Sequence, residues 1–379
     1  MLDPRILATL KESVQQCIEL DKPLLDQLVN EIQPLRSSQR RIQPRAATSV
    51  SLVGADGGNN ELRFDPFQVQ IIRIVDSNEN EYWTEVISPT SPLEQLNNRH
   101  IGENGEARSP LGRMMLALGV RSLSAITPMI KDVQPGEPRP PSWTQVYREL
   151  TEWAVLLDLL KKDYGSDTLI VFDGLLRSKV FSRTLFRDLG TLFKAEIDRL
   201  ARSRRNVFLV GVAKHSKVIE RYRLAMKILG VLRDPFPAFV EVPRELEAKA
   251  YVWPEYARGQ DDESEGGEQA KYLNGKMFLV KFGNRPGDTI WPVDVFEPQT
   301  QHASTIFGYL VKDAEEGFPV ALYPRCLQKA HEAAALSGLG MDMLQDIIFA
   351  VMRLSLGDRG TVLDEFQFES NDPAAARYR

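Results

Sequence analysis

The spacing of apolar residues predicts a helical start to the chain. Between Ile6 and Leu35, apolar side chains recur every three or four positions, which predicts one or two amphipathic helices. The next segment, from Arg36 to Arg45, carries four arginines and no acidic residue. We interpret it as a linker or an exposed arm, with contact to phosphates as the alternative.

Three strands with short links follow this segment. The run from Ser49 to Gly58 is rich in Val and Leu and ends abruptly at Asp56-Gly57-Gly58. Two further strands are expected at Phe67–Val75 and Glu81–Ile87, separated by the turn-forming residues DSNEN. Successive strands joined by short turns predict an antiparallel meander.

Helices and strands alternate in the second half of the chain. A strong helix is predicted after the breaker PGEPRPPS, with Ser142 as a possible N-cap and one apolar stripe formed by Val146, Leu150, Trp153, Leu157 and Leu160. A buried strand (168–174), a helix and a second strand (206–214) then predict a parallel α/β portion. Further elements are expected at 217–232 (helix), 277–282 and 289–296 (strands), and 326–336 and 341–354 (helices).

These elements divide the chain into two parts. We expect an N-terminal helical segment and basic linker over residues 1–45, and one domain over residues 46–379. The segment 258–270 is acidic and Gly-rich, which indicates a mobile insertion loop within that domain.

Composition indicates an ordinary soluble protein. The chain is 43% hydrophobic and 26% charged, and 47 basic residues against 52 acidic ones give a net charge of −5. This balance excludes a strongly basic nucleic-acid coat protein, although not a local basic face. Two cysteines, and no apolar run near the roughly 18 residues that span a bilayer, predict a cytoplasmic protein with no membrane segment.

Several common catalytic motifs are absent from the sequence. It contains no Walker A motif, GxGxxG, HExxH, CxxC or GxSxG, and only four histidines. P-loop ATP hydrolysis, Rossmann dinucleotide binding and the usual zinc-protease and hydrolase sites therefore have no support.

Two aspartates are the main candidates for chemistry. Asp56 and Asp173 each follow an apolar run and precede a glycine. A buried acid is costly unless its charge is compensated, and Mg²⁺ or Mn²⁺ prefers carboxylate oxygen. The alternative is that each aspartate caps the turn after its strand.

The helix before Asp173 supplies further acids. Glu149 and Glu152 both border its apolar stripe, so either could point toward the strand ends, with an exposed salt bridge as the alternative. Acids from two strands and a helix match two-metal phosphodiester cleavage. Lys214 follows its strand at the same topological position as the aspartates, where it could hold a phosphate.

Together these segments resemble the NurA nuclease family. SVSLVGADGG, RELTEWAVLLDLL, LIVFDGLLRSKVF, LVGVAKHSK and a YP-x6-H element occur in the family's order, over about residues 49–337. The resemblance implies an RNase H-like mixed sheet flanked by helices, a homodimer and a Mn²⁺- or Mg²⁺-dependent DNA nuclease, with exonuclease or endonuclease activity. It also implies partnership with a hexameric HerA-type ATPase in DNA-end processing or phage defence.

The resemblance also suggests individual roles. Asp56 and Asp173 correspond to metal-binding aspartates, and either Glu152 or Glu149 to the acid on the helix. Lys214 corresponds to the family's lysine, and Tyr323 and His331 to its late tyrosine and histidine, although a helical histidine beside alanines is more often packing. Arg177 and Lys179, in the LIVFDGLLRSKVF motif, are expected to contact DNA phosphates. The acidic insertion and the WAVLL-rich helix resemble a bacterial branch.

Two other functions fit parts of the pattern. A non-catalytic DNA-end adaptor would keep the fold and recruit a motor. An actin-like or sugar-kinase phosphotransferase would also use an Asp-Gly turn after its first strand, but it needs Gly-rich adenosine loops. Gly338-Leu339-Gly340 is a poor candidate for such a loop.

Overall fold

A nine-stranded mixed sheet forms the centre of the molecule. The computed structural model describes residues 4–45, 50–64, 67–134, 136–140, 142–250, 272–336, 339–357 and 360; the insertion 258–270 and the C-terminal tail lie outside them. The strands are β1 (Arg40–Arg41), β2 (Val50–Phe64), β3 (Phe67–Asp76), β4 (Glu81–Ile87), β5 (Asp167–Asp173), β6 (Val207–Val212), β7 (Ala238–Glu241), β8 (Gly275–Lys281) and β9 (Ile290–Phe296). Their spatial order is β1-β7-β8-β9-β6-β5-β2-β3-β4.

The strand pairing confirms the predicted meander and the parallel portion. Strands β2, β3 and β4 pair antiparallel, β5 pairs parallel with β2, and β6 pairs parallel with β5. This order, β4-β3-β2-β5-β6, is that of an RNase H-like sheet. Strands β9, β8, β7 and β1 extend it by antiparallel pairing. The fold is therefore the expected mixed α/β class.

Strand β2 does not end where the sequence predicts. Gly57 and Gly58 pair with Ile74 and Arg73 of β3, and β2 continues to Phe64. The parallel pairs with β5 end at Ala55, whereas the antiparallel partner β3 extends along the whole second half of β2. Asp56 thus lies inside a strand, at the point where the parallel pairing ends, and not in a turn.

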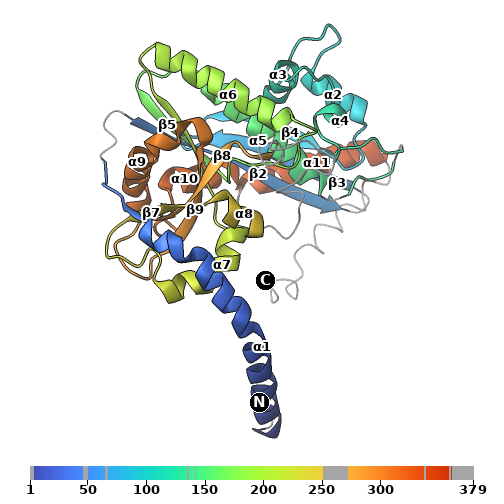
Figure 1. Cartoon of the computed structure of the whole chain (residues 1–379). Helices are drawn as coiled ribbons and strands as arrows, with labels where there is room; N and C mark the ends of the chain where they lie inside the picture. Colours follow the sequence, from blue (N-terminus) through green and yellow to red (C-terminus); the bar gives the residue numbers. More distant parts are fainter. Residues whose placement is uncertain are drawn as a thin grey trace.

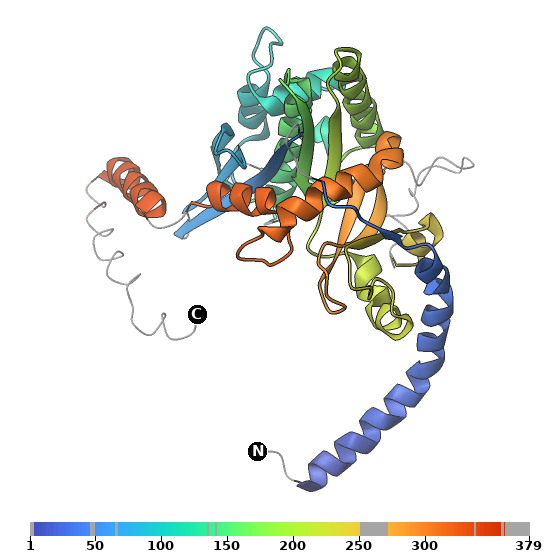
Figure 2. The ribbon, with the colours of Figure 1, turned by 90° about the vertical axis from the view of Figure 1, so that its left-hand side faces the viewer.

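Helices cover both faces of the sheet (Figures 1 and 2). They are α1 (Pro4–Ser37), α2 (Leu93–His100), α3 (Pro110–Ala117), α4 (Leu123–Ile126), α5 (Trp143–Lys161), α6 (Leu185–Arg202), α7 (Lys217–Leu229), α8 (Arg244–Ala250), α9 (Ala303–Glu315), α10 (Arg325–Ala334) and α11 (Leu339–Leu356), with a 3-10 helix at Glu297–His302. Alternate side chains of β5 point into two different hydrophobic cores. Ile170 and Phe172 pack with α5 and α6, whereas Leu169 and Val171 pack with α9 and α10.

Helix α5 confirms the predicted stripe but not its cap. All five predicted stripe residues are buried. Ser142, however, has helical backbone angles and makes no side-chain capping bond; its carbonyl instead accepts the Val146 amide (3.3 Å). A residue that already adopts the helical conformation lacks the extended geometry from which an N-cap oxygen reaches the first turn.

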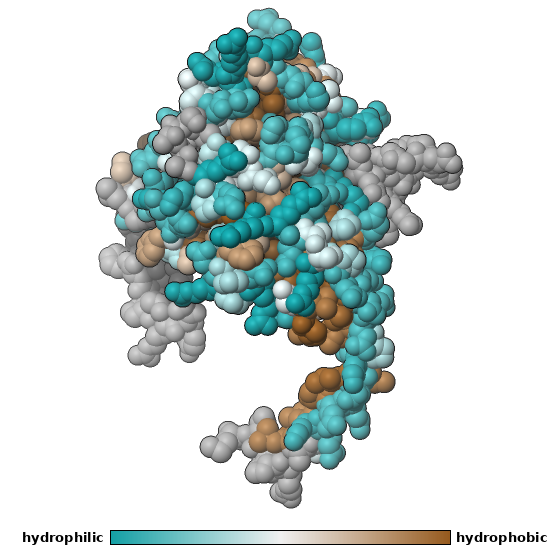
Figure 3. Space-filling model, turned by 60° about the vertical axis from the view of Figure 1, so that its left-hand side comes forward, coloured by the Kyte–Doolittle hydropathy of each residue, from teal (hydrophilic) through white to brown (hydrophobic). Residues whose placement is uncertain are grey.

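The two halves of α1 have different surroundings. Ile32 and Leu35 are buried in a core shared with α7 and α8. The N-terminal half projects from the body (Figures 2 and 3). In this half, Leu10, Val14 and Ile18 are 46% to 60% exposed. Only the C-terminal half of α1 is therefore packed in the core of this chain.

The basic segment after α1 joins the sheet. Arg40 and Arg41 form β1 against β7, with both side chains exposed. Ile42 is fully buried, and its amide donates to the Pro237 carbonyl (2.9 Å). None of the helices in the described ranges is long and apolar enough to cross a membrane.

Candidate functional site

Asp56 and Asp173 occupy the same level of neighbouring strands. In the parallel pair of β2 and β5, Ala55 is opposite Phe172, so the next residue of each strand is one of these aspartates. The backbone of Asp56 is described, whereas its side chain is outside the described part. Strand pairing therefore brings these two acids to the same level of the sheet, although they are 117 residues apart in the sequence.

The Asp173 carboxylate is held by two other predicted residues. The Tyr323 hydroxyl donates to its Oδ1 (2.7 Å), and Lys214 Nζ lies 3.4 Å from its Oδ2. Tyr323 is 1% exposed and comes from the loop before α10, and Lys214 follows β6. The Asp173 side chain is 15% exposed, so the arrangement remains open to a ligand.

Glu149 faces the loop that follows β5. Its Oε1 accepts hydrogen bonds from Ser178 Oγ (2.5 Å) and Trp153 Nε1 (3.4 Å). Burial raises the pKa of the Glu149 carboxyl, and the hydrogen bonds and the charges of Arg148 and Lys179 oppose that increase. A buried carboxylate of this kind is stabilised by any additional positive charge nearby.

Two contacts of α5 with the sheet locate its glutamates around the helix axis. Thr144 donates to Gln70 of β3, and Trp153 stacks on Phe172 of β5 (ring centroids 4.6 Å apart). Successive helical residues turn by about 100°. Measured from Thr144, Glu152 lies at roughly 80°, Glu149 at roughly 140° and Trp153 at roughly 180°, so both glutamates lie on the arc of α5 between these two contacts.

The opposite side of α5 faces the outer helices. Asp158 binds Arg113 of α3 there (2.6 Å). Glu152 is 14% exposed and pairs with Arg148 on its own helix (3.2 Å). Glu149 is thus bonded to the loop after β5, whereas Glu152 pairs with Arg148.

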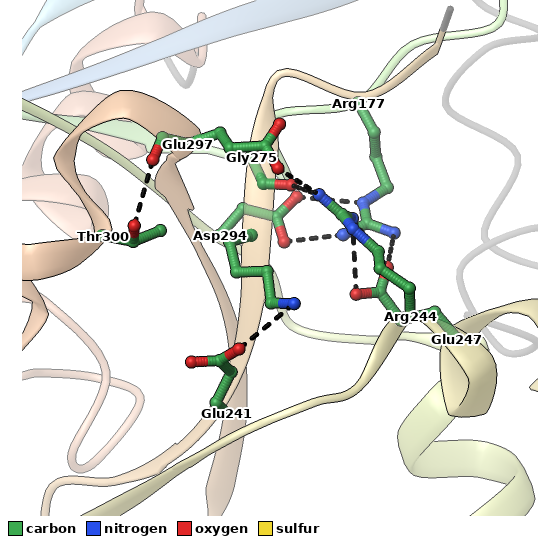
Figure 4. Close-up of polar contacts among 9 residues, drawn as sticks. Arg177, Glu241, Arg244, Glu247, Gly275, Asp294, Glu297 and Thr300 are labelled. Atoms are coloured by element: carbon green, nitrogen blue, oxygen red, sulfur yellow. Dashed lines mark hydrogen bonds and ion pairs between the residues drawn. The ribbon is translucent and has the colours of Figure 1, made fainter. Parts of the chain in front are cut away.

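Three other predicted residues lie in different surroundings. Arg177 is in a buried ion cluster, where it binds Asp294 through two nitrogens (2.7 and 2.9 Å) and Glu247 through a third (2.9 Å; Figure 4). Lys179 is exposed on the loop after β5, and His331 is exposed on α10. The structure brings none of these three into contact with Asp173 among the bonds it describes.

The partners of Arg177 in this ion cluster are not predicted from the sequence. Asp294 is an acid in the apolar strand WPVDVF, which is a signal for a buried charge, and it is fully buried. Its partner Arg177 lies 117 residues earlier in the chain. Burial raises the pKa of Glu247, and the positive charge of Arg177 opposes that increase. The sequence around each of these residues does not indicate that they form ion pairs with one another.

Comparison with known proteins finds similarity among solved structures. No family model and no curated protein matches the chain. The strand pairing described above defines the class of protein, an RNase H-like α/β protein.

Structures of NurA are among those that resemble this chain. The NurA nuclease from Sulfolobus solfataricus is 13% identical with a TM-score of 0.45, over 94% of this chain and 99% of its own. A structure of NurA with manganese is 11% identical with a TM-score of 0.40, over 91% and 99%. NurA bound to dAMP and manganese is 11% identical with a TM-score of 0.36, over 86% and 94%.

Proposed function

We propose that this protein is a metal-dependent DNA nuclease that hydrolyses phosphodiester bonds by a two-metal carboxylate mechanism. The observation that carries the proposal is the placement of two acids. Asp56 and Asp173 share one level of neighbouring parallel strands. Glu149 and Glu152 are the acids of α5, the helix whose Trp153 stacks on Phe172, the residue before Asp173.

The chemistry of these donors fits a hard divalent cation. Asp56, Asp173 and Glu152 would hold Mn²⁺ or Mg²⁺, with Glu149 close enough on the same helix to be the alternative. Among the side chains that the structure describes, no three potential ligands form a metal cluster, and Asp56 is not among those side chains. When bound, such ions activate water and stabilise the leaving oxygen.

The remaining residues of the site orient Asp173 and attract phosphate. The Tyr323 hydroxyl fixes one carboxylate oxygen, and it is itself held by packing against Trp291 (ring centroids 4.8 Å apart). Lys214 is 42% exposed, so its ammonium can leave Asp173 and contact a phosphate. Arg177 has no part in this proposal, because its guanidinium is committed to two buried carboxylates.

End-labelled linear DNA incubated with Mn²⁺ tests the proposal. We expect cleavage with Mn²⁺ and none after addition of EDTA. A purified protein that binds DNA ends but does not cleave them under either condition would favour the adaptor function over the nuclease. Binding of ATP in calorimetry, without DNA cleavage, would favour the phosphotransferase.

His331 is expected to assist turnover. At a metal-dependent phosphodiesterase site, a histidine can carry a proton to the leaving oxygen or bind a phosphate. The His331→Ala variant should then reduce turnover by about tenfold or more, with a smaller loss of DNA affinity. Equal losses in cleavage and binding would indicate a phosphate contact. Unchanged cleavage would leave His331 as a packing residue of α10.

We also infer a homodimer that works with a hexameric HerA-type ATPase, in DNA-end processing or phage defence. The net charge of −5 disfavours strong autonomous binding to DNA, because neutralisation of phosphates supplies most non-specific affinity. A motor that feeds DNA to the acids would raise the local substrate concentration. The exposed apolar residues of α1 offer a surface for either protein partner.

Analytical ultracentrifugation of the protein with the ATPase encoded beside its gene tests this partnership. We expect a dimer alone, a larger complex with the ATPase, and faster degradation of long duplexes when ATP is present. Changing both Leu10 and Val14 to Ser should weaken complex formation or dimerisation, and the core should remain folded. If no complex forms and ATP has no effect, the protein acts without this partner.

A further inference from the structure

A cleft of about 330 Å³ lies beside Asp173. It shares Lys214 with the candidate site and is bounded by the start of α7, the start of β9 and the loop before α10. Its volume lies within the range of pockets that hold a small ligand, roughly 300–1,000 Å³. Besides Lys214, only Trp291, which packs against Tyr323, also belongs to the site described above.

Basic residues outnumber acidic ones in the walls of the cleft. Lys214, His215 and Arg223 line it, and the single acid among its lining residues, Glu220, binds Lys217 (2.7 Å). Arg223 is exposed and forms no ion pair within the described residues. The cleft therefore suits an anion that reaches it from the Asp173 side.

Two further features favour a ligand with a phosphate and an apolar part. The N-terminus of the 13-residue helix α7 opens on the cleft, and Ser216 caps only one of its amides, that of Ile219 (3.1 Å). Free amides at a helix start favour an anion. Trp291, 6% exposed, also lines the cleft, and its buried indole N–H has no acceptor in the part of the chain described.

We propose that this cleft binds the DNA nucleotide next to the scissile phosphodiester. The neighbouring phosphate would contact Lys214, Arg223 and the start of α7, and the apolar part of the nucleotide would lie against Ile219 and Trp291. This assignment rests on the proposed DNA substrate, although a DNA adaptor without nuclease activity would use the same cleft.

DNA binding measured without cleavage tests the assignment. Fluorescence anisotropy with a short labelled DNA, in Ca²⁺ instead of Mn²⁺, should show that Arg223→Ala raises Kd about tenfold and lowers the salt slope by about one. Arg223→Lys should restore most of the affinity. Arg202→Ala is the matched control, because Arg202 is exposed at the end of α6, at the opposite end of β6 from Lys214, and should bind DNA as the wild type does.

A small substrate distinguishes DNA binding in the cleft from phosphodiester hydrolysis at the candidate site. Bis(p-nitrophenyl) phosphate has no neighbouring nucleotide, so Arg223→Ala should hydrolyse it as the wild type does while KM for DNA rises. Wild-type affinity for DNA in Arg223→Ala, or an equal loss in Arg202→Ala, would overturn the assignment. If the wild type cleaves neither substrate but Arg223→Ala still binds DNA more weakly, the nuclease proposal fails and the binding cleft stands.

Discussion

Asp56→Asn and Asp173→Asn are each expected to lose Mn²⁺-dependent cleavage of linear DNA by about a hundredfold or more. Charge that is arranged in advance at a reacting phosphate commonly contributes this much to the rate. Both variants should remain folded, because an amide is less costly to bury than a carboxylate. In Asp173→Asn, the amide oxygen can still accept the Tyr323 hydroxyl bond seen at 2.7 Å.

The measurement is an initial rate with end-labelled DNA, together with a thermal melt of each variant. Asp163→Asn is the matched control, since this carboxylate is 87% exposed and pairs only with Arg199 in the described ion pairs. It should cleave DNA at the wild-type rate. Substantial cleavage by either folded site variant would remove that aspartate from the metal site.

Glu152→Gln is expected to reduce cleavage about a hundredfold, and Glu149→Gln by about tenfold or less. The reason is the difference in the bonds of the two side chains on α5. Glu149 Oε1 already accepts hydrogen bonds from Ser178 and Trp153, whereas Glu152 pairs with Arg148, whose charge a cation can replace. A glutamine keeps the shape of each side chain and removes the charge that a cation needs.

Stability distinguishes a lost ligand from a damaged fold. Burial raises the pKa of Glu149 in the folded state, so the folded protein binds this proton more tightly than the unfolded chain does. The contribution of this group to the free energy of unfolding therefore falls as the pH rises from the pKa of Glu149 in the unfolded chain to its pKa in the folded protein. Glu149→Gln should consequently be as stable as the wild type at neutral pH in urea unfolding. A larger loss of cleavage in Glu149→Gln than in Glu152→Gln would reverse the two assignments.

Local pattern was sufficient for most elements of the fold. The meander strands Phe67–Asp76 and Glu81–Ile87 and the helix Trp143–Lys161 lie where the sequence predicts them, because a period of two or of 3.6 residues is already present in each segment. The end of β2 could not be predicted in this way. Gly57 and Gly58 normally signal a turn, but here the long antiparallel partner β3 supplies hydrogen bonds that keep them in the strand.

The sequence by itself determined which residues are candidates for the site: the acids next to glycine, the glutamates on the long helix, Lys214 and the late tyrosine. Only the tertiary structure decided their contacts. Tyr323 contacts Asp173 across 150 positions of the chain, Arg177 lies in a buried cluster with Asp294, and Glu149 bonds to Ser178 in the loop after β5. The physical reason is that a periodic pattern records how one segment buries its own apolar face. The partner of a buried charge depends on which distant segments the sheet brings together.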